Sequence, residues 1–300
     1  MILREVQEFE NLNFLAKKAM EGFISGLHSS PLRGFSVEFA EHRAYNPGES
    51  IKNLDWKLLA RTEKKYIKQF IEETNLKCHL WVDISKSMHY PENWNKQKLA
   101  ALSASSIMYL LQNQRDAFSL TLFNESHFHY QSDLKSTRGH LYQNIELLNN
   151  LWVKKPIEIN ENQPLNWITK CSSIKRRNMI VIISDFLWEN EKIESEFWQA
   201  LSYLQFLNSE ILLLNTFDTN TEIELNFGEL PLKFIDLENS QMIKLTPEEI
   251  KNSYIAQEQK RIEKLKENSF NLGVNYFDCD VSQPIEKALM EFYRQRLLLR

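Results

Sequence analysis

Two short polar segments carry side chains that could hold a metal ion. The first reads Asp83-Ile84-Ser85-Lys86-Ser87 and places one carboxylate and two hydroxyls on alternate residues. The second reads Ser184-Asp185 and supplies another carboxylate. Mg²⁺ prefers oxygen ligands in a near-octahedral arrangement and usually keeps several waters. These residue types predict a site for one Mg²⁺, or for Mn²⁺ in its place, with the ligands Asp83, Ser85, Ser87 and Asp185.

The same donor set bears on what the ion would do. Neither segment offers an imidazole or a thiolate, which disfavours zinc and copper. The hydroxyls are neutral, so a bound ion would stay electron-poor enough to accept a carboxylate from another protein. A competing interpretation is that Asp83 and Asp185 only end their strands and cap the helices that follow.

The apolar pattern around these segments predicts the fold. Residues 78–82 form a short apolar run that ends at Asp83, and residues 179–183 form the most continuous β-branched run in the chain. Such a run is typical of a central strand that is buried on both faces. From residue 76 onward, strand-like runs alternate with helical patterns, for example at 96–111 and 197–207. We therefore expect an α/β fold with a doubly wound, mostly parallel sheet, which binds ligands at the carboxyl ends of its strands.

The region before residue 76 has a different pattern of apolar and turn-forming residues. Apolar residues at spacings of three and four predict an amphipathic helix over 5–24. The stretch from 28 to 74 contains turn-forming pairs, with strand-like segments at 35–39 and 66–71. We predict two domains: residues 1–75, a helix with a small α+β region, and residues 76–300, the main α/β domain.

Composition limits the classes of partner and the compartment. The formal net charge of −4 is too small to indicate a nucleic-acid partner. The three cysteines are far apart, which favours reduced thiols over disulfides or a zinc site. No segment has the apolar length of a membrane span, and the N-terminus lacks the pattern of a secretory signal. We expect a cytoplasmic protein without a membrane span.

Several motifs resemble known families. Asp83-Ile84-Ser85-Lys86-Ser87-Met88 resembles the metal-ion-dependent adhesion site of von Willebrand factor A domains, which are Rossmann-like. Other segments resemble the bacterial domain-of-unknown-function-58 family in order and spacing: Gly34-Phe35-Ser36-Val37-Glu38-Phe39, Arg43-Ala44-Tyr45-Asn46-Pro47-Gly48-Glu49, Asn53-Leu54-Asp55-Trp56-Lys57, Ile183-Ser184-Asp185-Phe186 and Phe234-Ile235-Asp236-Leu237-Glu238.

This resemblance implies a role and a partner. Members of the family are commonly encoded beside MoxR-type AAA+ ATPases and are thought to act with them. The resemblance therefore implies a non-catalytic, Mg²⁺-dependent adaptor that works in the assembly or maturation of other proteins. Its partner would be such an ATPase, or a client of that ATPase, which contacts the metal through an acidic residue.

The sequence departs from the adhesion-site pattern at one ligand. Von Willebrand factor A sites usually add a threonine from a loop ahead of the second aspartate. The corresponding stretch, residues 160–165, has none, and Thr137 comes too early. An amide oxygen of Asn162 or Gln163 is the available substitute.

Enzymatic interpretations find little support in the sequence. No phosphate-binding loop, G-x-G-x-x-G fingerprint or G-x-S-x-G elbow occurs. A phosphatase with an aspartate nucleophile would carry an acid two residues after it, where Ser85 stands. One alternative stays open, a Mg²⁺-dependent hydrolase that uses the same site to activate water. We favour a non-catalytic protein, because no general base lies near either strand end in the sequence.

Overall fold

The computed structural model describes residues 12–28, 41–44, 56–62, 65–69, 76–92, 94–153, 163–188, 190–237 and 239–283. The chain divides into two compact units, one of residues 1–24 and 76–300 and the other of residues 25–75.

The larger unit is built on a seven-stranded sheet with the strand order β11-β8-β7-β3-β4-β5-β6. Its strands are β3 (Lys77–Asp83), β4 (Ala117–Phe123), β5 (His127–Gln131), β6 (Gln163–Pro164), β7 (Met179–Ser184), β8 (Glu210–Phe217) and β11 (Asn275–Asp280). The five strands from β11 to β4 run parallel, and β5 and β6 continue the sheet antiparallel. This architecture confirms the predicted α/β fold with a mostly parallel sheet.

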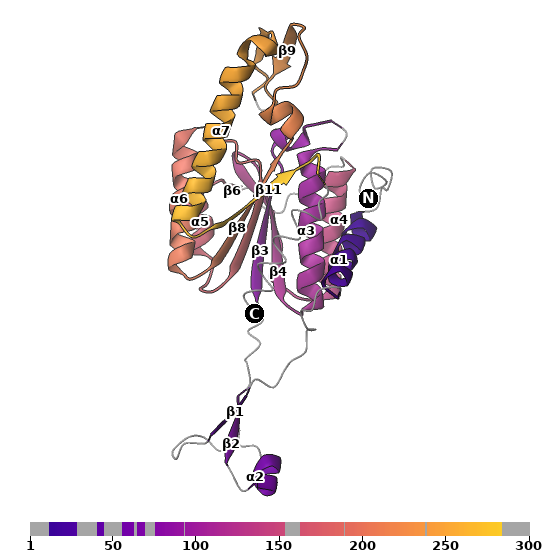
Figure 1. Cartoon of the computed structure of the whole chain (residues 1–300), viewed down its shortest axis with the longest axis vertical. Helices are drawn as coiled ribbons and strands as arrows, with labels where there is room; N and C mark the ends of the chain where they lie inside the picture. The colour runs from indigo at the N-terminus through magenta and orange to yellow at the C-terminus, as the bar shows by residue number, and fades with distance from the viewer. Residues whose placement is uncertain are drawn as a thin grey trace. The chain divides into compact units, whose positions relative to one another are not determined.

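Helices cover both faces of this sheet (Figure 1). One face packs against α1 (Leu12–His28), α3 (Lys96–Asn113) and α4 (Arg138–Trp152). The other packs against α5 (Trp167–Ser172), α6 (Glu191–Phe206) and α7 (Pro247–Asn271). Strand β3 contributes to the core on both faces of the sheet. Leu80 and Val82 pack in the layer that contains α3, and Trp81, between them, packs in the layer that contains α6. Alternating side chains of a strand point to opposite faces, and here both faces are buried.

Helix α1 belongs in part to the larger unit. Leu12, Leu15, Ala16 and Met20 are buried in the core layer that contains α3 and α4. The side chain of Tyr109 on α3 hydrogen-bonds Asn13. The predicted N-terminal domain of residues 1–75 groups this helix with the α+β region, whereas the unit boundary in the structure falls after Ile24.

The smaller unit is described only in part. It contains α2 (Trp56–Thr62) and a two-stranded antiparallel sheet of β1 (Glu41–Ala44) and β2 (Tyr66–Gln69). These elements lie within the residues that the sequence analysis assigns to a small α+β region. The predicted strand at 35–39 and the start of the predicted helix at 5–24 lie outside the described residues.

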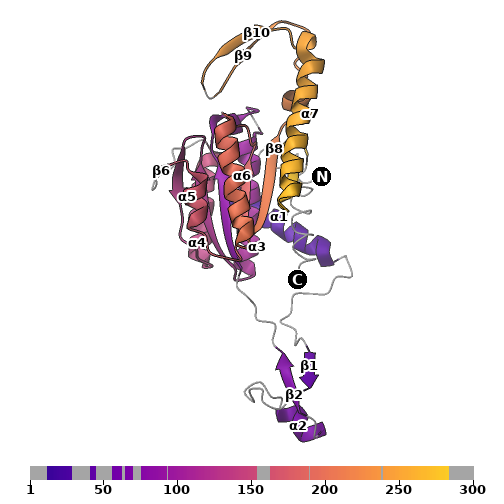
Figure 2. The same cartoon turned by 90° about the vertical axis from the view of Figure 1, so that its left-hand side faces the viewer.

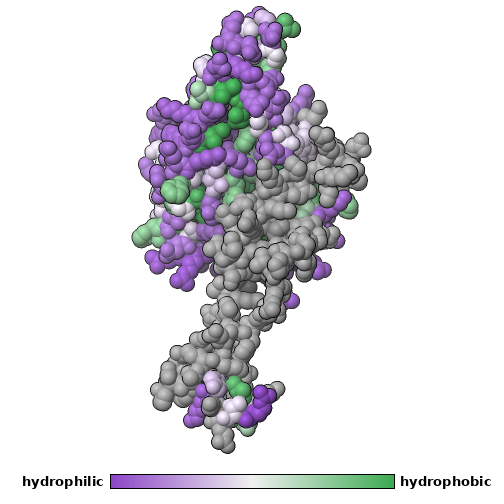
Figure 3. All heavy atoms as spheres, viewed as in Figure 1, coloured by the Kyte–Doolittle hydropathy of each residue, from purple (hydrophilic) through white to green (hydrophobic). Residues whose placement is uncertain are grey.

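An extension follows β8 that the sequence analysis did not predict. A π-helical turn, η4 (Thr219–Ile223), leads into a hairpin of β9 (Leu232–Ile235) and β10 (Met242–Leu245), after which α7 returns to the sheet (Figure 2). Hydrophobic residues interrupt the hydrophilic surface over α7 and the hairpin (Figure 3). Ile235, Met242 and Ile243 are exposed there. None of the helices in the described ranges is both long enough and apolar enough to pass through a lipid bilayer.

Candidate metal centre

The loop after β3 gathers three of the four predicted ligands. Asp83 is the last residue of β3, and its Oδ1 accepts a hydrogen bond of 2.8 Å from the backbone N–H of Ser85. The hydroxyl oxygens of Ser85 and Ser87 lie 3.0 Å apart. The short 3₁₀ helix η3 (Lys86–His89) fixes this curl of the chain. Three hard oxygens are thus brought together at the carboxyl end of a central strand.

The end of β7 is tied to the same loop. The hydroxyl of Ser184 donates to Asp83 Oδ2 at 2.6 Å and accepts from the backbone N–H of Phe186 at 3.0 Å. Phe186 is buried and has φ +49°, in the left-handed region that large side chains seldom occupy. Such a conformation costs of the order of 1–3 kcal/mol and persists only where surrounding contacts enforce it. Here the buried ring and the Ser184 hydrogen bond hold the turn that carries Asp185.

Asp185, the fourth predicted ligand, is engaged by the protein itself. Its Oδ1 accepts from the N–H of Leu187 at 3.3 Å, and its Oδ2 lies 2.8 Å from the Lys96 ammonium. Lys96 also contacts Glu222 Oε1 at 2.5 Å, and its side chain is only 1% exposed. Burial opposes the charge of this lysine, but Asp185 and Glu222 outweigh it and raise the pKa of Lys96. Neither Lys96 nor Glu222 was among the site residues predicted from the sequence.

The carboxyl group of Asp83 lacks such a counter-ion. Its hydrogen-bond donors are a backbone N–H and a serine hydroxyl, and no basic side chain contacts it within the described part of the chain. Burial, and after it the nearby charge of Asp185, raise the pKa of Asp83 to about 7 against the opposing hydrogen bonds from Ser184 and Ser85. A buried carboxylate destabilised in this way is the environment that a bound cation would relieve.

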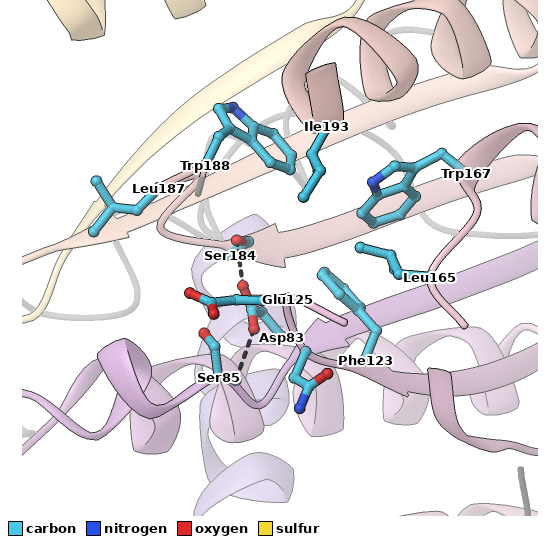
Figure 4. A pocket seen from close by; sticks show the side chains of 11 residues that line it. Asp83, Ser85, Phe123, Glu125, Leu165, Trp167, Ser184, Leu187, Trp188 and Ile193 are labelled. Carbon is cyan, nitrogen blue, oxygen red and sulfur yellow. Dashed lines mark hydrogen bonds between the residues drawn. The ribbon is translucent and has the colours of Figure 1, made fainter. Parts of the chain in front are cut away.

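A pocket opens beside Asp83 and Ser85. It encloses about 360 Å³ including its open mouth. Its polar lining adds Asn124 and Glu125 from the turn between β4 and β5, and Glu125 projects over the same side as Asp83 and Ser85 (Figure 4). Its apolar lining consists of Phe123, which directly precedes that turn, and of Leu165, Trp167, Leu187, Trp188 and Ile193. The predicted loop therefore sits at the edge of a mixed polar and aromatic depression.

The donor set fits a hard divalent cation. Two carboxylates and two hydroxyls come from two adjacent strand ends, and Mg²⁺ would complete its shell with water. Within the described ranges, no group of three or more His, Cys, Asp or Glu side chains is arranged to hold a metal. The proposed centre is not of that kind, because half of its protein donors are serine hydroxyls.

The threonine of the adhesion-site pattern has no counterpart in the described residues of the loop where it was sought. Residues 160–162 lie outside the described part of the chain, and Gln163 is exposed in the edge strand β6. The same loop contributes the apolar Leu165 to the pocket instead. Glu125 adds a further carboxylate to the pocket lining. The rule that led to Asp83 could have found it, since it follows the parallel strand β4 by two residues.

The family model described as "Protein of unknown function DUF58" matches residues 41–264. Uncharacterised proteins of Mycobacterium bovis and Mycobacterium tuberculosis are 25% identical to the chain over 177 residues, or 59% of its length. The matched part is 55% of each relative, so the chain spans about half the length of the curated relatives it matches.

Two solved structures have a similar arrangement. The conserved hypothetical protein BatB from Bacteroides thetaiotaomicron gives a TM-score of 0.42 at 12% identity. An aerotolerance-related membrane protein from Bacteroides fragilis gives a TM-score of 0.45 at 12% identity. In both cases the match covers 75% of this chain and 100% of the other.

Proposed function

The chain belongs to the DUF58 family, and from that premise we propose that it is a non-catalytic adaptor that binds a partner protein through one Mg²⁺. The observation that carries the proposal is the state of Asp83. This carboxyl group is buried, hydrogen-bonded only to neutral donors and placed near a second carboxylate. A divalent cation would supply the missing positive charge, and Ser85 and Ser87 offer it oxygens from the same loop.

The ligand types support a binding role. Serine hydroxyls and water leave more of the ion's charge uncompensated than further carboxylates would. An ion held in this way can accept a carboxylate oxygen from a partner as one of its ligands. The acidic side chain of an approaching protein is thus the group that the site would recognise.

The surroundings of the loop also favour contact with a protein. Leu187 is 43% exposed at the pocket rim, and Trp188 lies next to it. Aromatic and aliphatic residues around a specific polar contact are typical of the centre of a protein interface. We assign the partner as a MoxR-type AAA+ ATPase or its client, meeting the chain in the cytoplasm. This assignment comes from the family resemblance.

Partner capture tests the proposal. The full chain is immobilised and incubated with the purified MoxR-type ATPase encoded in the same genome, in Mg²⁺ or in EDTA. We expect the wild type to retain the ATPase in Mg²⁺. Relative to that amount, the wild type in EDTA and Asp83→Asn in either buffer should each retain at least about tenfold less. Asp116→Asn is the matched control. Asp116 is also a buried aspartate, but it directly precedes β4, at the edge of the sheet opposite to Asp83, where it accepts a hydrogen bond from Leu76 N–H. If the amount of captured ATPase changes neither with EDTA nor with Asp83→Asn, metal-mediated binding is refuted.

A Mg²⁺-dependent hydrolase is the second candidate, favoured by one observation. A carboxyl group whose pKa is about 7, as for Asp83, could exchange a proton with a substrate near neutral pH. No histidine is among the described residues that line the pocket, and Glu125 is the second carboxyl group there. Turnover of a phosphoester panel by the wild type, lost in Asp185→Ala, would establish this alternative in place of the adaptor.

A further inference from the structure

We infer that Lys96 is a tethered internal cation that occupies Asp185 and so sets the affinity of the site for its divalent ion. Lys96 is neither a ligand nor a group that a partner would touch; it acts on the metal through Asp185. The inference deepens the proposed function and rests on the metal site named there.

The position of Lys96 is fixed from both ends. It is the first residue of α3, and the preceding Asn95 caps that helix by accepting from the N–H of Lys98 at 2.9 Å. The next residue, Gln97, is buried and donates from Nε2 to the backbone carbonyl of Asp83 at 3.4 Å. The first turn of α3 therefore contacts the ends of both strands that carry the predicted ligands.

Glu222, the second partner of Lys96, is also fixed by hydrogen bonds. Glu222 lies in η4, where its Oε2 accepts from the backbone N–H of Asp218 at 2.8 Å. The backbone carbonyl of Glu222 accepts from the hydroxyl of Tyr254 on α7 at 2.8 Å. Lys96 consequently links the end of β7 to the segment after β8, and the Tyr254 hydroxyl links that segment to α7.

Charge explains why such a lysine would matter. When ionised, Asp83, Asp185 and Glu222 carry three negative charges in a largely buried region. Lys96 neutralises one of them, and a divalent ion would neutralise the other two. The ammonium also lies on one oxygen of Asp185, so a metal ion must share that carboxylate with a fixed positive charge. Lys96 therefore lowers affinity for the ion while keeping the metal-free site folded.

Two substitutions are expected to act in opposite directions. Lys96→Met removes the competing charge and releases Asp185, so the dissociation constant for Mn²⁺ should fall by at least about tenfold. Glu222→Gln leaves Lys96 to Asp185 alone and removes a negative charge, so that constant should rise by about threefold or more. A lysine that serves packing alone would give weaker binding in Lys96→Met, because the loss of its contacts would disorder the loops.

The experiment is calorimetric titration of the full chain with Mn²⁺, for wild type, Lys96→Met, Glu222→Gln and the control Lys98→Met. Lys98 lies in the same helical turn and stacks over Trp152, so its substitution removes a charge without touching Asp185 and should change the constant by less than about threefold. Tighter binding in Lys96→Met than in Lys98→Met supports the inference. Equal or weaker binding overturns it.

The outcomes also separate this inference from the proposed function. Wild type that binds Mn²⁺ while Lys96→Met does not bind it more tightly leaves the metal site standing and ends the role of Lys96. Wild type that fails to bind while Lys96→Met binds supports the internal cation and refutes the Mg²⁺-dependent adaptor. No binding by either ends both. Should Lys96→Met fail to fold even with Mn²⁺, Glu222→Gln decides, since unchanged or tighter binding in that variant overturns the inference.

Discussion

Asp83→Asn is expected to abolish stabilisation of the chain by Mg²⁺. A ligand that binds only the folded state stabilises it by about 2.7 kcal/mol at a free concentration one hundred times its dissociation constant. Wild type should therefore melt several degrees higher in saturating Mg²⁺ than in EDTA. The asparagine keeps the size of the side chain and one acceptor oxygen but removes the charge that would hold the ion. Differential scanning calorimetry in both buffers measures the shift.

The control for this result is again Asp116→Asn. Asp83 and Asp116 are both buried, but Asp83 ends β3, whereas Asp116 precedes the amino end of β4 and accepts a hydrogen bond from Leu76 N–H. Asp116→Asn should lower the melting temperature in both buffers and keep the Mg²⁺ shift. An equal Mg²⁺ shift in wild type and Asp83→Asn would show that any bound ion sits elsewhere.

The second large effect is a dependence of stability on pH that Mg²⁺ reverses. Burial and the charge of Asp185 raise the pKa of Asp83 from 3.8 to about 7. Between these values the folded state holds a proton that the unfolded state has released, so the slope of unfolding free energy against pH is negative. The contribution is favourable below the unfolded pKa and is lost as pH rises towards 7. In EDTA, Asp83 should therefore make the chain less stable at pH 8 than at pH 5.5.

Mg²⁺ should change the sign of this trend. Metal ligands bind in their deprotonated form, so affinity for the ion rises as Asp83 loses its proton. The Mg²⁺-induced rise in melting temperature should be small at pH 5.5 and largest at pH 8. Asp83→Asn serves as the internal reference, because it should remove both the decline in EDTA and the gain in Mg²⁺. A Mg²⁺ shift that is the same at both pH values would contradict an ionisable ligand with a raised pKa.

The fold could be predicted because its determinants are local and periodic. The apolar run at 179–183 became the central strand β7, and the run ending at Asp83 became β3 beside it. The unpredicted hairpin β9–β10 illustrates the limit. Its strands have four residues each and are partly exposed, so they lack the continuous apolar run that marks a buried strand.

The residues of the candidate site also fall into those that the sequence could predict and those that it could not. Asp83, Ser85, Ser87 and Asp185 could be named because each follows a recognisable strand, and parallel strands end at one edge of a sheet. Lys96 begins a helix thirteen residues after Asp83, and Glu222 follows β8 within a π-helical turn. Their meeting at Asp185 depends on where a long side chain reaches in three dimensions. Sequence spacing does not encode that reach, whereas burial of Lys96 in the structure reveals it.

The proposed function requires the loop tips after β3 and β7 to surround one divalent cation. The most direct test is an anomalous difference map from a crystal of the full chain grown with Mn²⁺. A single strong peak is expected within metal–oxygen bonding distance of the Asp83 and Asp185 carboxylates and the hydroxyls of Ser85 and Ser87. An ordered, fully occupied Mn²⁺ at another place, or a well-defined loop with no peak at saturating Mn²⁺, would contradict it.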